Sequence, residues 1–314
     1  MYYIGIDLGG TNIAAGIVDE KGKILLKDSI PTNRGRSYQE IIKDMAGLVL
    51  KVIQASGIPQ KDIKSIGIGS PGTPNSREGI LIYSNNLSFN NVPMRTEMQK
   101  YIDLPVYLDN DANCAALAES ICGAAKDVQD SVTVTLGTGV GAGIVLGGKV
   151  FSGFNNAASE LGHMVIVSGG EQCTCGRKGC WEAYASATAV IRQTKKAAEE
   201  NPDSLINKLV NGDLSKIDAK TAFDAARQDD EVGKAVVKQY IFYIAEGLTN
   251  IINAIEPEVI AIGGGVSKEG EYLLKPLREF VNEGSYCLQV PQTQIRTAQM
   301  GNDAGIIGAA MLGL

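Results

Sequence analysis

One histidine and three cysteines form the group of residues whose possible chemistry is most specific. His163 is the only histidine among 314 residues, and Cys173, Cys175 and Cys180 follow it within a short stretch. One imidazole and three thiolates are a typical ligand set for tetrahedral zinc, and a zinc ion with four protein ligands has no position open for catalysis. The four residues therefore predict a structural zinc site.

Glycines in the same stretch support this prediction. Gly176 and Gly179 lie between Cys175 and Cys180, where a tight loop needs backbone with positive φ and no Cβ. The stretch has few apolar side chains, so a bound metal would supply much of its folding free energy. Two alternatives remain, a disulfide between two of the cysteines and a histidine that only packs in the core. The disulfide would require an oxidising compartment, which nothing else in the sequence indicates.

Length and composition indicate an α/β protein that is long enough to form two lobes. Of the 314 residues, 44% are hydrophobic and 20% are charged, and the net charge is −6, as is ordinary for a globular protein. Lysine and arginine form no runs, which argues against a nucleic-acid partner. No stretch reaches the roughly 18 apolar residues of a membrane span, and the N-terminus lacks the basic and apolar regions of a signal peptide.

The remaining cysteines, Cys114, Cys122 and Cys287, are scattered through apolar segments. Such residues are usually reduced core thiols, which are typical of the cytoplasm. We therefore expect a cytoplasmic protein with neither nucleic acid nor a membrane as its partner.

Glycine-rich turns follow three of the strands that the sequence predicts. The first turn is Gly9–Asn12, after the strand Tyr2–Ile6, and the second is Gly137–Gly139, after Val132–Leu136. The third, Gly263–Gly265, follows residues 258–262. Glycines let backbone N–H groups approach an anion. None of the turns matches the Walker loop, and the second continues as a strand, whereas a dinucleotide fingerprint requires a helix. A nucleoside triphosphate between two lobes is therefore expected in preference to NAD.

The segment around the second turn repeats the segment around the first. Aligning Gly10 with Gly137 also aligns residues 15–18 with 142–145, both of which read Ala-Gly-Ile-Val. Glycine-turn hairpins can resemble each other by chance, but an ungapped match inside corresponding elements favours an internal duplication. Asp7 then falls opposite Val134, so the two halves would share architecture without sharing chemistry.

Helices are expected where apolar residues recur at helical spacing. A capping box at Ser37–Glu40 begins one, and Gly57 ends it. The other expected helices are Ala115–Ile121, Glu182–Glu200, Thr221–Arg227, Glu231–Ile255 and, after a capped start at Gly301–Ala304, Gly305–Leu312.

Phosphoryl transfer needs a phosphate cradle, a cation and a carboxylate that accepts the proton of the attacking hydroxyl. Asp111 follows the predicted strand Pro105–Leu108 at the strand end where ligands of α/β sheets bind, and it is the candidate general base. Asp7, beside the first turn, is the candidate for the outer shell of a Mg²⁺ ion. The run Asp109–Asp111 could instead be the N-cap of the following helix, and different members of the run can serve both roles.

These motifs together resemble those of the ROK (repressor, open reading frame, kinase) family of sugar kinases, over nearly the whole chain. The resemblance is carried by Asp7–Asn12, Leu136–Gly141, Ile262–Gly265, Glu160–His163 and Cys173–Glu182. It implies a two-lobed actin-like (ribonuclease H-like) α/β fold with duplicated sheet-and-helix halves, and a homodimer. The implied lobes are residues 1–113, to which the C-terminal helix at about 302–314 returns, and residues 114–301 with the zinc loop and the adenosine site.

The resemblance also implies the site residues, with ATP, Mg²⁺ and a structural Zn²⁺ as cofactors. Asp111 would be the catalytic base. The sugar would be bound by Gly72, Asn110, Asp111, Glu160, His163 and Glu182. The nucleotide and its Mg²⁺ would be bound by Asp7, Gly9, Gly10, Thr11, Asn12, Gly137, Thr138, Gly139, Gly263, Gly264 and Gly265. The zinc ligands would be His163, Cys173, Cys175 and Cys180, of which His163 also touches the sugar.

Within the family, residues 110–117 and 182–186 look most like those of the glucokinases, which implies phosphorylation of the 6-hydroxyl of glucose. Kinases for N-acetylmannosamine, N-acetylglucosamine, fructose or allose share nearly all of these residues, so another hexose is the first alternative. A non-catalytic sugar-sensing protein is the second. The family's repressors carry an N-terminal DNA-binding domain, and we expect none here because the first strand begins at Tyr2.

Overall fold

The computed structural model describes residues 1–314 in two compact units. Unit 1 comprises residues 1–133, 143–159 and 298–314, and unit 2 comprises residues 134–142 and 160–297. The division falls inside strands β9 (Ser131–Leu136) and β10 (Val140–Leu146). The lobes expected from the sequence, residues 1–113 with about 302–314 and residues 114–301, stay a prediction.

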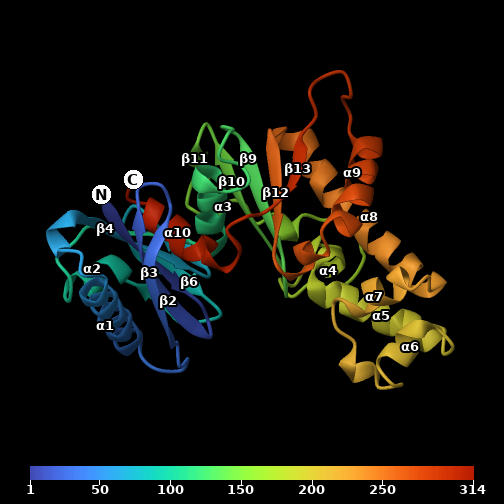
Figure 1. The fold of residues 1–314 in the computed structure, drawn as a ribbon, viewed down its shortest axis with the longest axis horizontal. Coiled ribbons are helices and arrows are strands. Elements are labelled where there is room, and N and C mark those ends of the chain that lie inside the picture. The colour runs from blue at the N-terminus through green and yellow to red at the C-terminus, as the bar shows by residue number, and fades with distance from the viewer. The chain divides into compact units, whose positions relative to one another are not determined.

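Unit 1 is built on a five-stranded sheet with the order β3-β2-β1-β4-β8. Strands β1 to β3 form an antiparallel meander, and β4 and β8 continue the sheet in parallel with β1. Both chain ends belong to this unit (Figure 1). The strands are β1 (Tyr2–Leu8), β2 (Asn12–Asp19), β3 (Ile24–Pro31), β4 (Ile63–Ser70) and β8 (Val106–Asn110).

The two faces of β1 serve different purposes. Ile4, Ile6 and Leu8 point to one face, where they pack in a core with helix α1 (Tyr38–Ser56). The opposite face carries the alternate residues, which include Gly5 and Asp7. The alternation therefore places an acidic side chain on the face of the sheet that α1 does not cover.

Helix α1 begins and ends as the sequence predicts. The Ser37 hydroxyl accepts a hydrogen bond from the Glu40 N–H, and the Glu40 carboxylate accepts one from the Ser37 N–H, so the capping box is confirmed. Gly57 ends the helix in the left-handed conformation, with φ of 69°.

Helix α10 (Ala304–Met311) packs on the other face of the sheet and against helix α3 (Asp111–Cys122) in direct backbone contact. A Cβ on Gly5 would lie 1.8 Å from the Ile306 carbonyl oxygen, and a Cβ on Gly67 would lie 1.7 Å from the Ala309 carbonyl oxygen. On the α3 side, a Cβ on Gly308 would lie 1.7 Å from the Cys114 carbonyl oxygen. Any side chain at these glycines would push α10 away from its neighbours.

The second sheet has the order β11-β10-β9-β12-β13. When the five strands of each sheet are numbered in chain order, both sheets have the same spatial order: third, second, first, fourth and fifth strand. The duplicated halves expected from the sequence are therefore confirmed by the strand order. The remaining strands of this sheet are β11 (Lys149–Val150), β12 (Val259–Gly263) and β13 (Gln294–Thr297).

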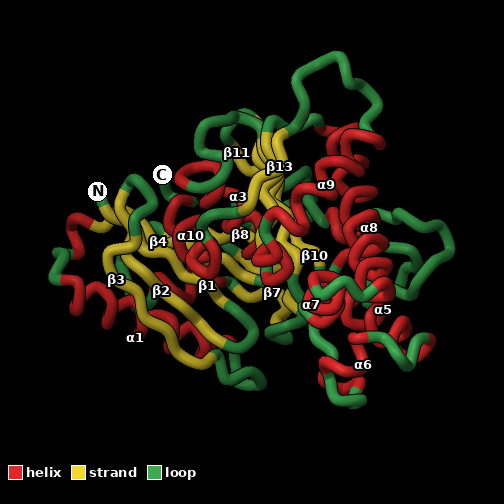
Figure 2. The backbone as a smooth tube through the Cα atoms, turned by 45° about the vertical axis from the view of Figure 1, so that its right-hand side comes forward, coloured by secondary structure: helices red, strands yellow, loops and turns green.

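Unit 2 also contains a group of helices that lie side by side in both views (Figures 1 and 2). The Trp181 side chain is fully buried beside α8, where its indole N–H donates to the Tyr243 carbonyl 2.8 Å away and its ring occupies the space that a side chain at Gly247 would need. The helices are α4 (Glu182–Ala185), α5 (Ala187–Glu200), α6 (Leu205–Leu209), α7 (Thr221–Arg227), α8 (Glu231–Ile255) and α9 (Glu271–Gly284).

Some expectations are wrong in detail. The helix expected over Glu182–Glu200 is broken at Ser186, because the Ser186 hydroxyl caps the Ala189 N–H and starts a new helix. Helix α3 begins at Asp111 and not at Ala115. The start expected at Gly301–Ala304 is a 3₁₀ turn in which Asp303 forms no side-chain cap.

One expected core thiol is also wrong, because Cys287 is exposed, while Cys114 is buried and Cys122 is half-buried. A small sheet was not expected at all. It consists of β5 (Thr73–Asn75), β6 (Ile80–Ser84) and β7 (Phe89–Val92), followed by α2 (Met94–Gln99). The Arg95 guanidinium donates to the carbonyls of Ser76 and Arg77, between β5 and β6, and to that of Val106 in β8. None of the helices has the length and apolar character needed to cross a bilayer.

Candidate functional site

The acidic residues of the first half that the sequence analysis selected lie together at the C-terminal ends of strands β1, β4 and β8. Asp7 in β1 pairs with Gly69 in β4, and Gly69 pairs with Asp109 in β8. The chain then turns directly into α3, whose first residue is Asp111. A Cβ on Gly69 would lie 3.8 Å from the Asp111 Cα, so the start of α3 packs close over the glycine between the two strands.

Asn110 is the N-cap of α3. Its side-chain oxygen accepts from the N–H groups of Ala112 (2.8 Å) and Asn113 (3.3 Å), and its amide donates to the Gly72 carbonyl (3.0 Å). The N-cap alternative is therefore correct for Asn110, and Asp111 becomes the first helical residue. One N–H of the Asn110 amide stays available for a ligand, since this amide has two.

Burial changes the acidity of these carboxyl groups. Burial, reinforced by the nearby charge of Asp111, raises the pKa of Asp7 to about 6. Burial also raises the pKa of Asp111, against the opposing effect of a hydrogen bond from the Ala112 N–H. The pKa of Asp109 is raised by burial as well, although hydrogen bonds from Asn113 and Asn110 oppose the shift. A carboxyl group with a raised pKa is a stronger proton acceptor than a solvated one.

The first glycine turn is fixed by a residue that sequence reasoning missed. The Thr32 hydroxyl donates to the Gly9 carbonyl (2.7 Å), and the Thr32 N–H donates to the Thr11 carbonyl (2.8 Å). Thr32 itself is fully buried. The side chains of Thr11 and Asn12 are exposed, so their polar groups can meet a ligand.

The second glycine turn is fixed by the N-terminal ends of α4 and α5. The Gly137 carbonyl accepts from the Ala187 N–H (2.7 Å), and the Thr138 carbonyl accepts from the Thr188 hydroxyl (2.8 Å). The Glu182 carboxylate accepts from the Val140 N–H (3.0 Å), and it lies where a side chain at Gly139 would have to be. Glu182 therefore contacts the turn directly.

The third glycine turn lies against the second one. Gly264 has φ of +83°, and a Cβ there would lie 2.4 Å from the Leu136 carbonyl oxygen, immediately before Gly137. Only glycine suits this position, because the backbone is left-handed and there is no space for a side chain. The structure thus brings together two of the turns that the sequence assigned to one nucleotide.

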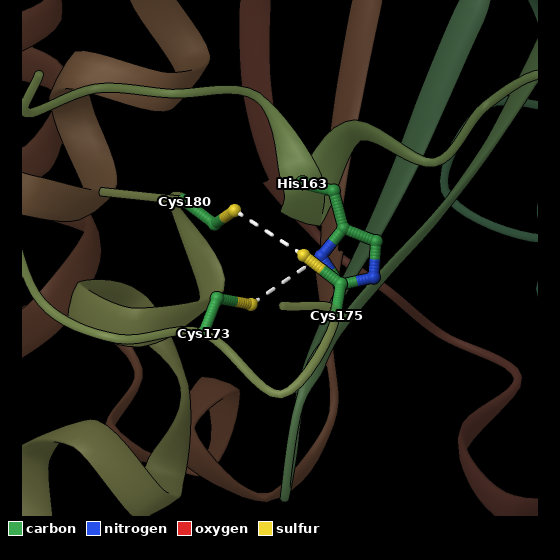
Figure 3. A group of neighbouring side chains, drawn as sticks. All are labelled: His163, Cys173, Cys175 and Cys180. Atoms are coloured by element: carbon green, nitrogen blue, oxygen red, sulfur yellow. Dashed lines mark hydrogen bonds between the residues drawn. The ribbon is translucent and has the colours of Figure 1, made fainter. Parts of the chain in front are cut away.

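The four expected zinc ligands converge in unit 2 (Figure 3). Their ligand atoms all lie within 4.8 Å of one another. The Cys173 Sγ is 3.6 Å from the His163 Nδ1, and the Cys175 Sγ is 3.7 Å from the Cys180 Sγ. No disulfide joins them, since all six cysteines are free.

These distances fit a tetrahedral metal site. With Zn–S bonds of about 2.3 Å and Zn–N bonds of about 2.0 Å, tetrahedral geometry requires S···S distances of about 3.8 Å and S···N distances of about 3.5 Å. The two measured distances agree with both values. Cys173 and Cys180 are buried and Cys175 is exposed. Solvent therefore reaches the cluster at Cys175.

The loop Cys173–Cys180, called the metal-ligand loop below, also contacts the side chain of Glu182. The Thr174 hydroxyl donates to the Glu182 carboxylate (3.2 Å), and the Cys173 Sγ lies 3.9 Å from the same oxygen. The Arg177 guanidinium donates to the His163 carbonyl (3.2 Å). Glu160, at the start of the 3₁₀ turn Leu161–His163, is exposed. One carboxylate thus links the loop to the second glycine turn.

The sequence contained little signal for the bracing residues. Thr32 follows a strand without any motif, and Thr174 stands among cysteines that attract attention first. Thr188 could have been found, because a serine two residues earlier is a plausible N-cap. Their roles depend on contacts between segments far apart in the chain.

The repeated strand order, with a glycine turn after β1 and another after β9, defines an actin-like (ribonuclease H-like) α/β fold. Comparison with known proteins specifies the family. The model of the ROK family matches residues 3–314. The chain therefore belongs to the ROK family.

Individual relatives match over nearly the full length. A glucokinase from Thermotoga maritima is 38% identical over 310 residues, which cover 98% of this chain and 96% of the relative. A glucokinase from Halalkalibacterium halodurans is 35% identical over 312 residues, covering 99% and 94%. The crystal structure of a ROK family glucokinase from Streptomyces griseus, in complex with glucose and AMPPNP, has a TM-score of 0.81, 34% identity and 99% coverage of both chains.

Proposed function

We propose that the protein is a sugar kinase that transfers the γ-phosphate of ATP to the 6-hydroxyl of glucose, with Asp111 as the general base. The observation that carries the proposal is similarity over nearly the whole chain to two glucokinases and to a solved glucokinase that holds glucose and AMPPNP. The carboxylates at the edge of the first sheet support it with a suitable acid–base group.

In this mechanism Asp111 accepts the proton of the 6-hydroxyl as the hydroxyl oxygen attacks the γ-phosphorus. A new O–P bond forms, the bond from phosphorus to the β,γ-bridging oxygen breaks, and ADP leaves. Burial raises the pKa of Asp111, which strengthens it as a base.

The glycine turns would bind the nucleotide. Backbone N–H groups of Gly9–Asn12 and Gly137–Gly139, with the Thr11 and Thr138 hydroxyls, would hold the phosphates, and Gly263–Gly265 would hold the adenosine. A Mg²⁺ ion bound with ATP would neutralise phosphate charge. Asp7, beside the first turn, would bind that ion through water.

The remaining polar residues would hold the other sugar hydroxyls. They are Gly72, Asn110, Glu160, His163 and Glu182. The His163 Nδ1 faces Cys173, which leaves Nε2 for a hydroxyl. Zinc on His163, Cys173, Cys175 and Cys180 would then fix the imidazole and, through Thr174, the Glu182 carboxylate.

An ATP-coupled assay with a panel of hexoses tests the proposal. We expect glucose to give the highest kcat/KM, ahead of N-acetylmannosamine, N-acetylglucosamine, fructose, mannose and allose. A clear preference for another hexose would contradict glucose as the substrate and would leave the proposed kinase reaction in place. Sugar binding without turnover of any hexose would contradict the kinase assignment and favour a sensor.

The proposal includes a homodimer in the cytoplasm. Light scattering after size exclusion would give twice the 33.2 kDa mass of one chain. A single-chain mass at micromolar concentration would contradict the dimer and leave the proposed reaction unaffected.

A further inference from the structure

A second buried carboxylate in unit 1, Glu119, has no part in the mechanism described so far. Its side chain is 1% exposed and lies on α3, eight residues after Asp111. It accepts hydrogen bonds from the Ala124 N–H (2.7 Å), the Met300 N–H (2.7 Å) and the Gln299 N–H (2.8 and 3.0 Å to its two oxygens). Its partners are therefore backbone groups and not a cation.

A buried carboxylate destabilises the fold unless both of its oxygens accept hydrogen bonds. Removing a carboxylate from water carries a large penalty, which hydrogen bonds to the charged form offset. Both oxygens of Glu119 have partners, and two of the three donors come from the segment that precedes α10. A buried carboxylate that binds consecutive N–H groups fixes the axial position of that segment, because a shift by one residue would break two bonds.

The segment leads directly to the acidic group of the proposed active site. Met300 is followed by the 3₁₀ turn Gly301–Asp303 and then by α10. In the first turn of α10, a Cβ on Gly305 would lie 2.6 Å from the Asp7 carboxylate. Helix α10 thus contacts Asp7 at its start, and it contacts α3, which carries Asp111, at Gly308.

We propose that Glu119 is a positioning residue that holds α10 in register along α3 and so keeps the carboxylates of Asp7 and Asp111 at their working separation. The side chains of Ile306, Ile307 and Met311 pack α10 against its neighbours, and such apolar contacts are not directional. The bonds from Gln299 and Met300 to Glu119 add directional contacts in the segment that precedes the helix. This inference rests on the proposed function insofar as Asp7 and Asp111 serve phosphoryl transfer.

The sharpest test removes a single donor. Met300 has φ of −80°, which proline can adopt, so Met300→Pro deletes one N–H and leaves Glu119 unchanged. Met300→Ala keeps the N–H and loses the side chain that packs beside Cys122, as proline does, so it serves as the matched control. We expect Met300→Pro to lower kcat at least fivefold with the KM for sugar changed less than twofold, and Met300→Ala to retain most of kcat.

Glu119→Gln is the stronger variant, since one of its carboxylate oxygens becomes an NH₂ group facing donors. We expect kcat to fall at least tenfold. Val52→Ala, in the α1 core of the same unit, controls for lost stability. It should lower Tm by several degrees and keep kcat at temperatures well below Tm. Equal retention of kcat in all variants would overturn the positioning role and leave Glu119 as a structural group.

A second readout is independent of turnover. NMR titration of the Asp7 carboxyl should give a pKa near 6 in the wild type, set by burial and by Asp111, and a lower pKa in Met300→Pro. The other titratable groups beside it are Asp109 and the buried Cys114 thiol. An unchanged titration of Asp7 would contradict the inference. If the wild type phosphorylates no sugar, the proposed function fails while this titration still tests Glu119.

Discussion

Two hairpins with the same place in the strand order differ in their chemistry. In the first, β1 carries Asp7 beside the turn, whereas in the second, β9 carries Val134 at the corresponding position, fully buried. Both hairpins keep a glycine turn. The comparison indicates that the two copies share a backbone turn, and that only the first copy has a carboxylate beside it, where the proposed acid–base and cation chemistry would lie.

The two turns are also braced differently. The first is held by Thr32 at the end of its own sheet's third strand. The second is held by Glu182, Ala187 and Thr188, residues that follow the metal-ligand loop. The first turn should therefore depend only on the sheet, and the second should depend on the proposed zinc ion.

The largest effect on activity is expected from replacing Asp111, the proposed general base. Asp111→Asn removes the proton acceptor and should lower kcat by about 10³-fold, measured in the coupled assay. Glucose should still raise the Tm of this variant, because binding and chemistry use different features. A variant that keeps its rate would show that another group is the base.

Metal removal should separate the two turns. Chelation, or Cys175→Ser, should lower Tm and weaken sugar and ATP binding together, because the loop that positions Glu182 loses its main stabilisation. Cys287→Ser, which alters an exposed thiol outside the cluster, is the control and should retain zinc and activity. An apo protein with unchanged ligand affinity would mean that the metal does not support the second turn.

Asp7→Asn should raise the free energy of unfolding and lower kcat. The pKa of Asp7 is raised to about 6 from an ordinary value of 3.8, so its charge opposes folding above pH 6, and the opposition fades as pH falls toward 4. The variant should be about 3 kcal/mol more stable at pH 8, should gain less at pH 5, and should have lower kcat. Denaturant unfolding at both pH values measures this. A gain that is equal at pH 5 and pH 8 would exclude the carboxyl group as its cause.

The smallest effects are expected from the threonines that brace the turns. Thr32→Val and Thr188→Val each remove one hydroxyl hydrogen bond of about 1 kcal/mol, so each should raise the KM for ATP about two- to fivefold. Only the Thr188→Val effect should grow when zinc is removed. Equal growth for both variants would show that the two turns are not braced independently.

The sequence was sufficient wherever local rules determine the structure. Helices α7 and α8 have the predicted limits, and the capping box of α1 forms as expected, since their signals lie within a few residues. The zinc ligands could be grouped because three of them are neighbours in the chain. The glycine turns were visible because each follows a predicted strand, although only Gly264 among their glycines has a positive φ.

Features that depend on distant segments could not be predicted. The sheet β5–β7 is short, and Arg95 joins the turn after β5 to Val106 in β8, a contact between distant segments. At Ser186 the N-cap itself is a local signal, but the bond from the Ala187 N–H to the Gly137 carbonyl is not. Glu119 looks like any glutamate on a helix until residues 299 and 300 return to it.

Trp181, which lies between Cys180 and Glu182 in the chain, is fully buried, and its position has a practical consequence. It is the only tryptophan in the chain, so all indole emission comes from this one position. The fluorescence spectrum should therefore shift to longer wavelength when the loop from Cys173 to Cys180 loses its metal, since the ring would then meet water. The protein carries its own optical probe at the point where the metal-ligand loop and the second glycine turn meet.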